Sequence, residues 1–381
     1  MDSVPESPEI YVSPDALNEN EDYLTKQIIT YIGNKRALLP FIAQGLDRVR
    51  RRLGRDKLAV FDVFSGSGIT ARFFKRFAHT LLVNDLEKYS GIINRCYLSN
   101  RGDRNIPVLE GLYRDLTGAL AENSLRPGMI AALYAPLDDD NIGAGERVFY
   151  TRRNAMYIDT ARELIGGIEE AYRPYFLAPL LSEASIHSNT SGVFKGFYKN
   201  RETGTGQFGG RNRNALARIK GEIHLPFPVF SNFDCDCLIY NGDSNLVMRS
   251  APEVDLAYLD PPYNQHPFGS NYFMLNLIAE YKTPAAISPV SGIPQGWNRS
   301  LYNKKRYALG TLRELAAGLK AKFILISFNS EGLISFDEMG EMLRDIGRFE
   351  VLETAYPVFR GSRNLAGRNI HVKEYLYVLE K

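Results

Sequence analysis

Residues 58–74 read LAVFDVFSGSGITARFF, an apolar run that passes through a Ser-Gly-Ser-Gly turn into a second apolar run. This pattern predicts a strand over Leu58 to Val63, a tight turn, and a helix from Ile69 to Phe77. A second short strand, Leu81 to Val83, and a helix ending near Leu98 follow. Because strands alternate with helices, we predict an α/β protein with a parallel, doubly wound sheet.

The alternation stops near Asn100 and resumes at Val254. Between these points we expect mainly amphipathic helices, near Asp159 to Glu170 and near Pro179 to Ile186. A catalytic sheet interrupted by a largely helical insertion is therefore predicted. The expected division is an acidic flexible leader (1–22), a sheet domain (23–100 and 237–381) and an insertion (101–236). The later expected elements are strands at Val254 to Leu259, Phe323 to Phe328, Val351 to Phe359 and Val372 to Leu379, with helices at Lys304 to Leu319 and Phe336 to Ile346.

Composition supports a globular protein of one large domain or two moderate ones. The 381 residues are 44% hydrophobic and 24% charged, which excludes fibrous and wholly disordered classes. No apolar run reaches the length of a membrane span, and the acidic N-terminus does not resemble a secretory signal. We therefore expect a soluble protein that is not exported, acts in the cytoplasm and makes no membrane contact.

Charge is distributed unevenly along the sequence. The net charge is only +2, yet residues 1–22 contain seven acids and no Lys or Arg. The rest of the chain is therefore basic, with clusters at 48–57, 195–220 and 360–373. Several separated basic patches are typical of proteins that bind a phosphate backbone, although any one of them could be a solvated face.

The glycine loop by itself leaves the cofactor open. Gly66-Ser-Gly68-Ile-Thr-Ala71 follows a strand, and Asp85 lies about 20 residues further on, where a ribose hydroxyl acceptor is expected. Both NAD and S-adenosylmethionine satisfy this pattern, because each needs close backbone approach and an acid at the end of the second strand. A plain tight turn is the alternative.

The tetrapeptide Asp260-Pro261-Pro262-Tyr263, directly after a predicted strand, favours one chemistry. An exocyclic amine on adenine is conjugated with its ring and is a poor nucleophile. The Asp260 side chain and a proline carbonyl can accept its two N–H bonds and free the lone pair for attack. Proline offers a rigid carbonyl without a competing N–H, and Tyr263 offers a ring on which a base can stack. A Pro-Pro turn closing a strand is the structural alternative.

These segments together resemble the Dam-type (alpha-group) DNA adenine-N6 methyltransferases, most closely the methylases of restriction-modification systems. The resemblance rests on Asp260 to Tyr263, on Phe64-Ser-Gly-Ser-Gly68, and on Tyr31-Ile-Gly-Asn-Lys35 before a leucine-rich helix. It covers roughly Tyr31 to Lys381, including a closing motif through Val372-Lys-Glu-Tyr-Leu376. It implies a Rossmann-like sheet that binds S-adenosylmethionine, releases S-adenosylhomocysteine and methylates a flipped-out adenine. It also implies a prokaryotic enzyme acting at the nucleoid.

The resemblance assigns cofactor roles residue by residue. Tyr31, Gly33 and Lys35 would hold the methionine end of the cofactor, with Lys35 as the partner of its carboxylate. The loop would be formed by Asp62, Phe64, Gly66 and Gly68. Asp85 matches the ribose-binding acid, and Asp243 matches the acid that contacts the cofactor's adenine amine. An N-cap role for Asp85 and a surface position for Lys35 are the alternatives. The five histidines are scattered without metal spacing, so no metal is expected.

Double-stranded DNA is the expected partner, possibly accompanied by a cognate restriction endonuclease. The expected DNA-binding residues are Lys195, Lys199, Arg211, Arg213, Arg360 and Arg363. In Ser191 to Tyr198, glycines and aromatic residues favour DNA contact over core packing. Methylation of RNA adenine or of a protein glutamine, a non-catalytic DNA-binding protein on the same scaffold, and an NAD enzyme remain the alternatives.

Overall fold

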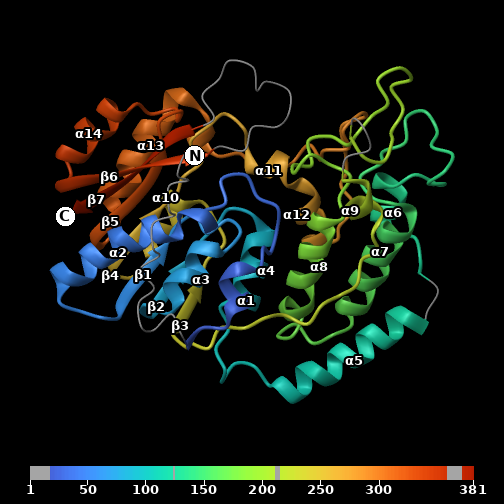
Figure 1. Ribbon diagram of the computed structural model, residues 1–381, viewed down its shortest axis with the longest axis horizontal. Coiled ribbons are helices and arrows are strands. Elements are labelled where there is room, and N and C mark those ends of the chain that lie inside the picture. The colour runs from blue at the N-terminus through green and yellow to red at the C-terminus, as the bar shows by residue number, and fades with distance from the viewer. Residues whose placement is uncertain (1–17, 123–124, 211–214, 358–370) are drawn as a thin grey trace, which may run out of the picture.

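A seven-stranded sheet dominates one half of the molecule (Figure 1). The computed structural model describes residues 18–122, 125–210, 215–357 and 371–381. The strand order is β3-β2-β1-β4-β5-β7-β6; β1 to β5 run parallel, and β7 pairs antiparallel with both β5 and β6. The predicted parallel, doubly wound sheet is confirmed. The strands are β1 Leu58–Asp62, β2 Ala78–Val83, β3 Asp236–Ile239, β4 Val254–Leu259, β5 Ala321–Asn329, β6 Arg348–Pro357 and β7 His371–Glu380.

Helices cover both faces of the sheet, because its central strands are apolar on both sides. Every residue of β4 is buried, as expected for a central parallel strand. On β1, Val60 faces a core formed with α2 and α3, whereas Phe61 faces a core formed with α10, α13 and α14. The covering helices are α2 Leu39–Leu53, α3 Ile69–Lys75, α10 Ser244–Ser250, α13 Lys305–Gly318 and α14 Phe336–Arg344.

A second half, on the right of Figure 1, is built from helices. Its core joins α4 to α8 and α12, and these helices share one buried cluster. In the part of the chain that the structure describes, every helix is too short or too polar to cross a membrane. The remaining helices are α1 Glu21–Thr25, η2 Arg36–Leu38, α4 Lys88–Tyr97, α5 Ile106–Glu122, α6 Met129–Tyr134, α7 Arg152–Gly166, α8 Pro174–Ile186, α9 Leu216–Lys220, α11 Phe268–Asn271, α12 Phe273–Glu280 and η4 Leu301–Asn303.

Local signals placed the sheet elements better than the helical ones. The helix expected from Asp159 begins at Arg152, where the Thr151 side chain caps it by accepting from the Asn154 N–H. Pro179 lies inside α8 and does not begin it. Edge strand β3 escaped prediction because it has only four residues and an exposed, alternating pattern. The division of the chain into a leader, a sheet domain and an insertion stays a prediction.

Asp255 ties down the amino end of β4. It is buried, and its carboxylate accepts a hydrogen bond from the Ala59 N–H at 3.0 Å and pairs with Arg55 and Lys322, each at 3.0 Å. Burial acts to raise the pKa of this carboxyl, but the Ala59 N–H and the Lys322 ammonium outweigh burial and hold the pKa below its usual value. The ionised side chain therefore stabilises the fold.

We expect Asp255→Asn to lower the free energy of unfolding at neutral pH by about 1–3 kcal/mol. Because the folded-state pKa lies below the unfolded value of about 3.9, the ionised side chain stabilises the protein fully above the unfolded value. This stabilisation is lost as the pH falls through the folded-state pKa. Urea titrations should show the variant and the wild type converging in acid. Asp56→Asn, which removes an acid whose side chain is 99% exposed, should change little at any pH.

Candidate active site

One pocket lies at the carboxyl ends of four adjacent strands. The loops after β1, β2, β3 and β4 all line it. The strand order turns between β1 and β4, and doubly wound sheets bind their ligands at such a switch point. The lining residues are Tyr31, Ile32, Gly33, Phe64, Gly66, Asn84 to Glu87, Gly242 to Ser244, Asp260 to Asn264, Phe268, Gly269, Asn298, Ser300, Tyr302 and Asn303.

The glycine loop after β1 is shaped for close approach. Gly66 and Gly68 have φ of +52° and +77°, which side-chain-bearing residues rarely adopt. A Cβ on Gly66 would lie 2.9 Å from the Tyr31 ring, so this glycine lets the upstream segment close on the loop. Asp62 lies beneath the loop, where it accepts a 2.6 Å hydrogen bond from the Thr70 hydroxyl. It supports the loop from the buried side and does not line the pocket.

Asn84, directly after β2, joins three of these loops. Its side-chain nitrogen donates to the carbonyls of Val63 (3.2 Å) and Gly242 (3.1 Å), and its oxygen accepts from the Gly242 N–H at 3.1 Å. The loops after β1, β2 and β3 are therefore held together by one amide. Nothing in the sequence marked this residue except its position beside Asp85.

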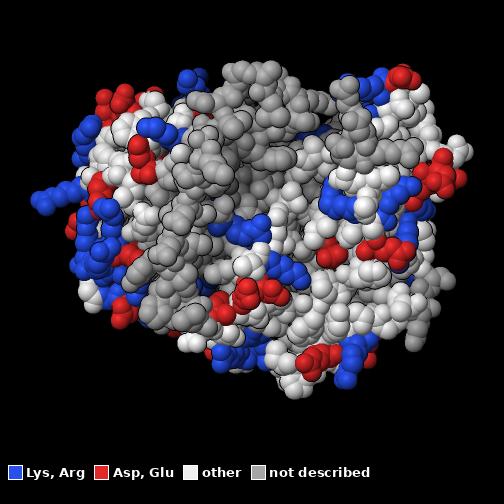
Figure 2. Space-filling view, viewed as in Figure 1, with Lys and Arg blue, Asp and Glu red and all other residues white. Residues whose placement is uncertain are grey.

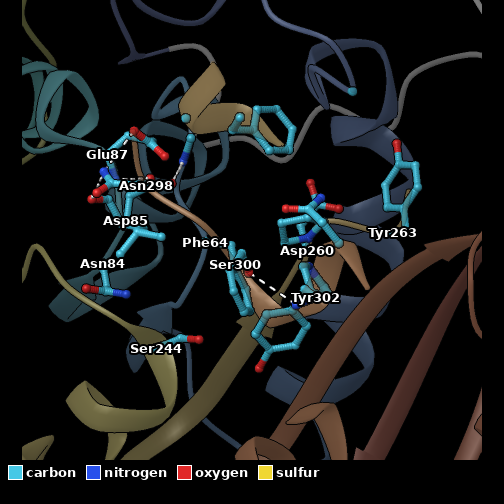
Figure 3. Close-up of a pocket in the computed structure, with 18 of the residues that line it drawn as sticks. Phe64, Asn84, Asp85, Glu87, Ser244, Asp260, Tyr263, Asn298, Ser300 and Tyr302 are labelled. Atoms are coloured by element: carbon cyan, nitrogen blue, oxygen red, sulfur yellow. Dashed lines mark hydrogen bonds between the residues drawn. The ribbon is translucent and has the colours of Figure 1, made fainter. Parts of the chain in front are cut away.

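Two acids, Asp85 and Glu87, stand together at one end of the pocket (Figure 3). Asp85 accepts from the N–H groups of Gly66 and Glu87, each at 2.8 Å. Burial raises the pKa of Asp85 to about 6, against the effect of these N–H bonds. Burial and then the charge of Asp85 raise the pKa of Glu87 to about 7. The sequence predicted Asp85 and missed Glu87.

Asp243 is the N-cap of α10 and also lines the pocket. One of its oxygens caps the helix by accepting from the Asn245 N–H at 2.9 Å. Near it, the rings of Phe64 and Tyr302 meet edge to face with centroids 5.2 Å apart. The Tyr302 hydroxyl donates to the Asn245 side chain at 2.7 Å. This end of the pocket thus combines acids with aromatic walls, a composition suited to a nucleoside.

Asp260 and Tyr263 occupy the other side of the pocket (Figure 3). The Lys35 ammonium lies 3.1 Å from Asp260 Oδ1 and 5.1 Å from the centre of the Tyr263 ring. Burial raises the pKa of Asp260, and Lys35 opposes that change. Burial disfavours the charge of Lys35, but its neighbours, Asp260 foremost, raise the pKa of Lys35 well above its ordinary value. The predicted cofactor role of Lys35 stays a prediction; in this structure its partner is Asp260.

Aromatic stacking holds the segment before α2 against the pocket. The Tyr31 ring stacks on Phe268 and Tyr272, with centroids 5.0 and 4.8 Å apart. The Tyr272 hydroxyl accepts from the Ile32 N–H at 2.7 Å. Tyr31 thus packs between the glycine loop and the helices that follow Asp260 to Tyr263.

Residues 282–303, after α12, form a further part of the site that the sequence did not reveal. Asn298 donates to the Glu87 carboxylate at 3.1 Å, and its backbone packs so closely on Gly269 that a Cβ there would lie 2.3 Å from the Asn298 oxygen. The same segment touches the helical half, where the Tyr134 hydroxyl donates to the Gly292 carbonyl at 2.8 Å. No sequence motif indicated these residues, because their contacts are with segments that are distant in the sequence.

Lys195 and Lys199, two of the predicted DNA-binding residues, are exposed on the helical half. Lys199 pairs with Gly206 in a short hairpin, and the Gln207 N–H donates to the Tyr198 carbonyl at 3.0 Å. Figure 1 shows this segment standing out at the upper right. The other four predicted residues, Arg211, Arg213, Arg360 and Arg363, lie outside the described residues.

Two expectations about the basic clusters need correction. Phe194 is buried against Phe149 and Phe273, so this aromatic residue belongs to the core and not to a DNA surface. Arg218 donates to backbone carbonyls, including that of Ser188 at 3.0 Å, and is therefore not free for phosphate.

Arginines of the 48–57 cluster are paired with acids. Arg52 lies 2.6 Å from Glu350, and Arg50 lies 3.1 Å from Asp56. Figure 2 shows blue and red atoms mixed at the left of the view, over the sheet half. A cluster compensated in this way attracts phosphate less than its sequence suggests. Figure 2 also shows basic atoms at the right of the view, over the helical half.

Among the described residues, no group of three or more His, Cys, Asp or Glu side chains is arranged to hold a metal ion. A glycine loop, a nucleoside-type acid pair and Asp-Pro-Pro-Tyr in one pocket define an S-adenosylmethionine-dependent methyltransferase of amino groups. Residues 31–288 match the family described as D12 class N6 adenine-specific DNA methyltransferase, and the protein belongs to this family.

Curated relatives include three methyltransferases of similar kind. The chain is 29% identical over 365 residues to the type II methyltransferase M.NlaIII of Neisseria lactamica, covering 93% of this chain and 99% of the relative. It is 28% identical over 357 residues to M.CviAII of Paramecium bursaria Chlorella virus 1, covering 92% and 97%. It is 25% identical over 369 residues to the modification methylase StsI of Streptococcus sanguinis, covering 92% of this chain and 52% of the relative.

We expect Gly66→Ala to weaken S-adenosylmethionine binding by about tenfold or more, a loss of about 1.4 kcal/mol. The added Cβ would strain the positive φ and push against Tyr31. Gly54→Ala is the matched control, because Gly54 has φ +63° but open space around its Cβ. Isothermal titration should show unchanged cofactor affinity for Gly54→Ala; equal affinities for both variants would contradict a role for the loop.

Proposed function

We propose that this protein is the modification methylase of a type II restriction-modification system and methylates N6 of one adenine within a specific duplex site. The observation that carries the proposal is the placement of Asp260 to Tyr263 in the same pocket as the glycine loop and Asp85. The names of M.NlaIII and M.CviAII, matched over nearly their whole lengths, support the type II assignment. A cognate restriction endonuclease would be its partner in the cell, with cytoplasmic action at the nucleoid.

The pocket fits S-adenosylmethionine. Its lining joins a glycine loop, whose Gly66 leaves no room for a Cβ beside the Tyr31 ring, to acids and aromatic side chains. When bound, S-adenosylmethionine supplies an electrophilic methyl group. We assign the ribose hydroxyls to Asp85 and the adenine amine to Asp243, whose carboxylates both line the pocket. Tyr31 and Gly33 would enclose the methionine end.

The side of the pocket beside Asp260 would receive the target adenine. In duplex DNA the adenine is stacked and its N6 amine is paired with thymine, so the nucleotide must flip out to reach Asp260. The Asp260 carboxylate and the Pro261 carbonyl would each accept one N–H of the amine, which localises the nitrogen lone pair. Methyl transfer forms an N–C bond and breaks an S–C bond, and one N6 proton must leave. Asp260, whose pKa burial raises, would accept this proton.

Tyr263 would stack on the extruded base. The Lys35 ammonium lies over its ring, and the ring meets Phe328 edge to face with centroids 5.7 Å apart. The ring is thus held by neighbours on the sheet side. Stacking of a base on an aromatic side chain contributes about 1–3 kcal/mol.

Sequencing that reports modified adenine in DNA from expressing cells tests the proposal directly, because it names base, context and strand together. We expect Asp260→Ala to abolish this methylation while leaving S-adenosylmethionine affinity within about a few fold. Asp337→Ala, which removes an exposed acid at the start of α14, should methylate normally. A methylating Asp260→Ala enzyme, or a large loss of cofactor binding in that variant, would overturn the assignment of Asp260.

Lys195 and Lys199 would contact phosphates from the exposed surface of the helical half. The double variant Lys195→Ala/Lys199→Ala should weaken DNA binding and flatten its salt dependence by up to about two units of log-log slope. Arg249→Ala/Arg313→Ala is the control, since both arginines are paired with acids on the sheet half. Binding isotherms at several salt concentrations check this expectation; equal slopes for both double variants would place the phosphate contacts elsewhere.

A further inference from the structure

Exposed cations stand next to pocket-lining residues along the stretch that leads into α13. The pocket-lining residues of this stretch are Asn298, Ser300, Tyr302 and Asn303 (Figure 3). Arg299 lies between the first two, and Lys304 and Arg306 follow the last; all three are exposed. We call Arg299, Lys304 and Arg306 the cationic rim. None of the three lines the pocket itself.

No acid compensates the cationic rim. Among the described residues, no carboxylate forms an ion pair with Arg299, Lys304 or Arg306. Further along α13, by contrast, Arg313 lies 2.7 Å from Asp345. The rim therefore keeps its positive charge available for an anion from outside the chain.

The neighbouring Lys305 differs from the rim, although it too is exposed. Hydrogen bonds from Ser335, and then the charge of Lys305, hold the pKa of Glu338 below its usual value. An acid of α14 is thus already near Lys305, and this lysine is not counted in the rim.

The position of the rim on α13 is not explained by the stability of the helix. Lys304 is the N-cap of α13 and Arg306 lies in its first turn, where there is neither an acid nor a capping side chain. The amino end of a helix carries partial positive charge, so cations there are unfavourable. An external anion would relieve this repulsion, because the rim and the helix end attract it together.

Aromatic side chains order the rim without neutralising it. The Arg299 guanidinium carbon lies 4.3 Å from the centre of the Trp297 ring. Arg306 and Lys304 lie 5.7 and 5.9 Å from the centre of the Tyr307 ring. Such cation–π contacts restrain a side chain while its full charge remains.

One hydrogen bond holds the rim beside the part of the pocket that contains Asp260 to Tyr263. The side-chain nitrogen of Asn303 donates to the Asn264 carbonyl at 2.8 Å. Asn264 directly follows Tyr263, and Lys304 directly follows Asn303. The rim is therefore at the mouth of the pocket on the side that would receive the target adenine.

We propose that the cationic rim binds the two phosphates that flank the flipped-out adenine nucleotide. A nucleotide that leaves the base stack stays bonded to a phosphate on each side, so these phosphates must approach the mouth of its pocket. Contacts of this kind position the strand and carry no sequence information. The inference rests on the proposed function and adds a phosphate site on the sheet half, separate from Lys195 and Lys199.

The triple variant Arg299→Gln/Lys304→Gln/Arg306→Gln should weaken duplex binding by about tenfold or more. It should also flatten the salt dependence by about two units of log-log slope, about one for each phosphate. Affinity for S-adenosylmethionine should stay within about a few fold, since no rim residue lines the pocket. Binding isotherms at several salt concentrations measure these quantities.

Two controls separate the rim from general charge effects. Lys320→Gln/Arg344→Gln/Arg348→Gln removes three exposed cations near the amino ends of β5 and β6, at the edge of the sheet away from the pocket. This variant loses the same total charge and should keep the wild-type slope. Arg299→Lys/Lys304→Arg/Arg306→Lys keeps the charge of the rim and should retain most of the slope.

Uncharged methylphosphonate linkages identify which phosphates the rim contacts. Placed on both sides of the target adenine, they should lower the affinity of the wild type by about tenfold. The triple variant should lose less than about twofold, because each contact is already missing its protein partner. The same two linkages near one end of the duplex should affect the wild type and the triple variant equally.

The inference is overturned if the triple variant keeps the wild-type affinity and slope. It is also overturned if the flanking methylphosphonates weaken the wild type and the triple variant equally. In either case, adenine methylation by the wild type leaves the proposed function standing. Absence of that methylation would remove the proposed function, and the inference with it.

Binding of S-adenosylmethionine reports whether the triple variant is folded. If it is not, the single variants Lys304→Gln and Arg306→Gln decide. A slope lower by about one unit in each supports the inference, and unchanged slopes in both overturn it.

Discussion

The buried pair of Lys35 and Asp260 is the contact on which the architecture of the site depends. It joins the segment before α2 to the end of the central strand β4, across more than half of the sequence. Because both groups are removed from water, the pair is stable only while the surrounding loops keep their places. The stacking of Tyr31 on Phe268 and Tyr272 supplies part of that restraint. The pair fixes where the Asp260 carboxylate lies, and under the proposed function this same carboxylate would accept the target amine.

The parallel sheet explains why acids gather at one pocket. Its strands end at one edge, so the loops after β1 to β4 meet there even though the sequence separates them widely. Asn84 then fixes three of the loops with one side chain. Burial raises the pKa of Asp85 to about 6, and burial followed by the charge of Asp85 raises the pKa of Glu87 to about 7. Such pKa values are typical of functional sites, because strain of this kind is retained where a ligand relieves it.

The two halves of the molecule meet at the segment 282–303. Its Asn298 touches the acid end of the pocket through Glu87, while Gly292 accepts from Tyr134 in the helical half. The segment therefore contacts both the pocket and the helical half. The charge pattern agrees with this division, since basic residues of α2 are compensated by acids, whereas Lys195 and Lys199 remain exposed on the helical half.

Local sequence determined the strand-turn-helix over residues 58–74, the alternation of strands and helices, and the Asp-Pro-Pro-Tyr segment. Hydrophobic periodicity and the backbone preferences of glycine and proline act over only a few residues, so the sequence alone reveals them. It also named six of the nine acids and aromatic residues that line the pocket: Tyr31, Phe64, Asp85, Asp243, Asp260 and Tyr263. It did not name Glu87, Phe268 and Tyr302. Tertiary structure alone paired Lys35 with Asp260, buried Phe194, directed Arg218 to backbone carbonyls and brought Asn298 to the site. Those outcomes depend on which surfaces pack together, and contacts between distant segments leave no periodic mark in the sequence.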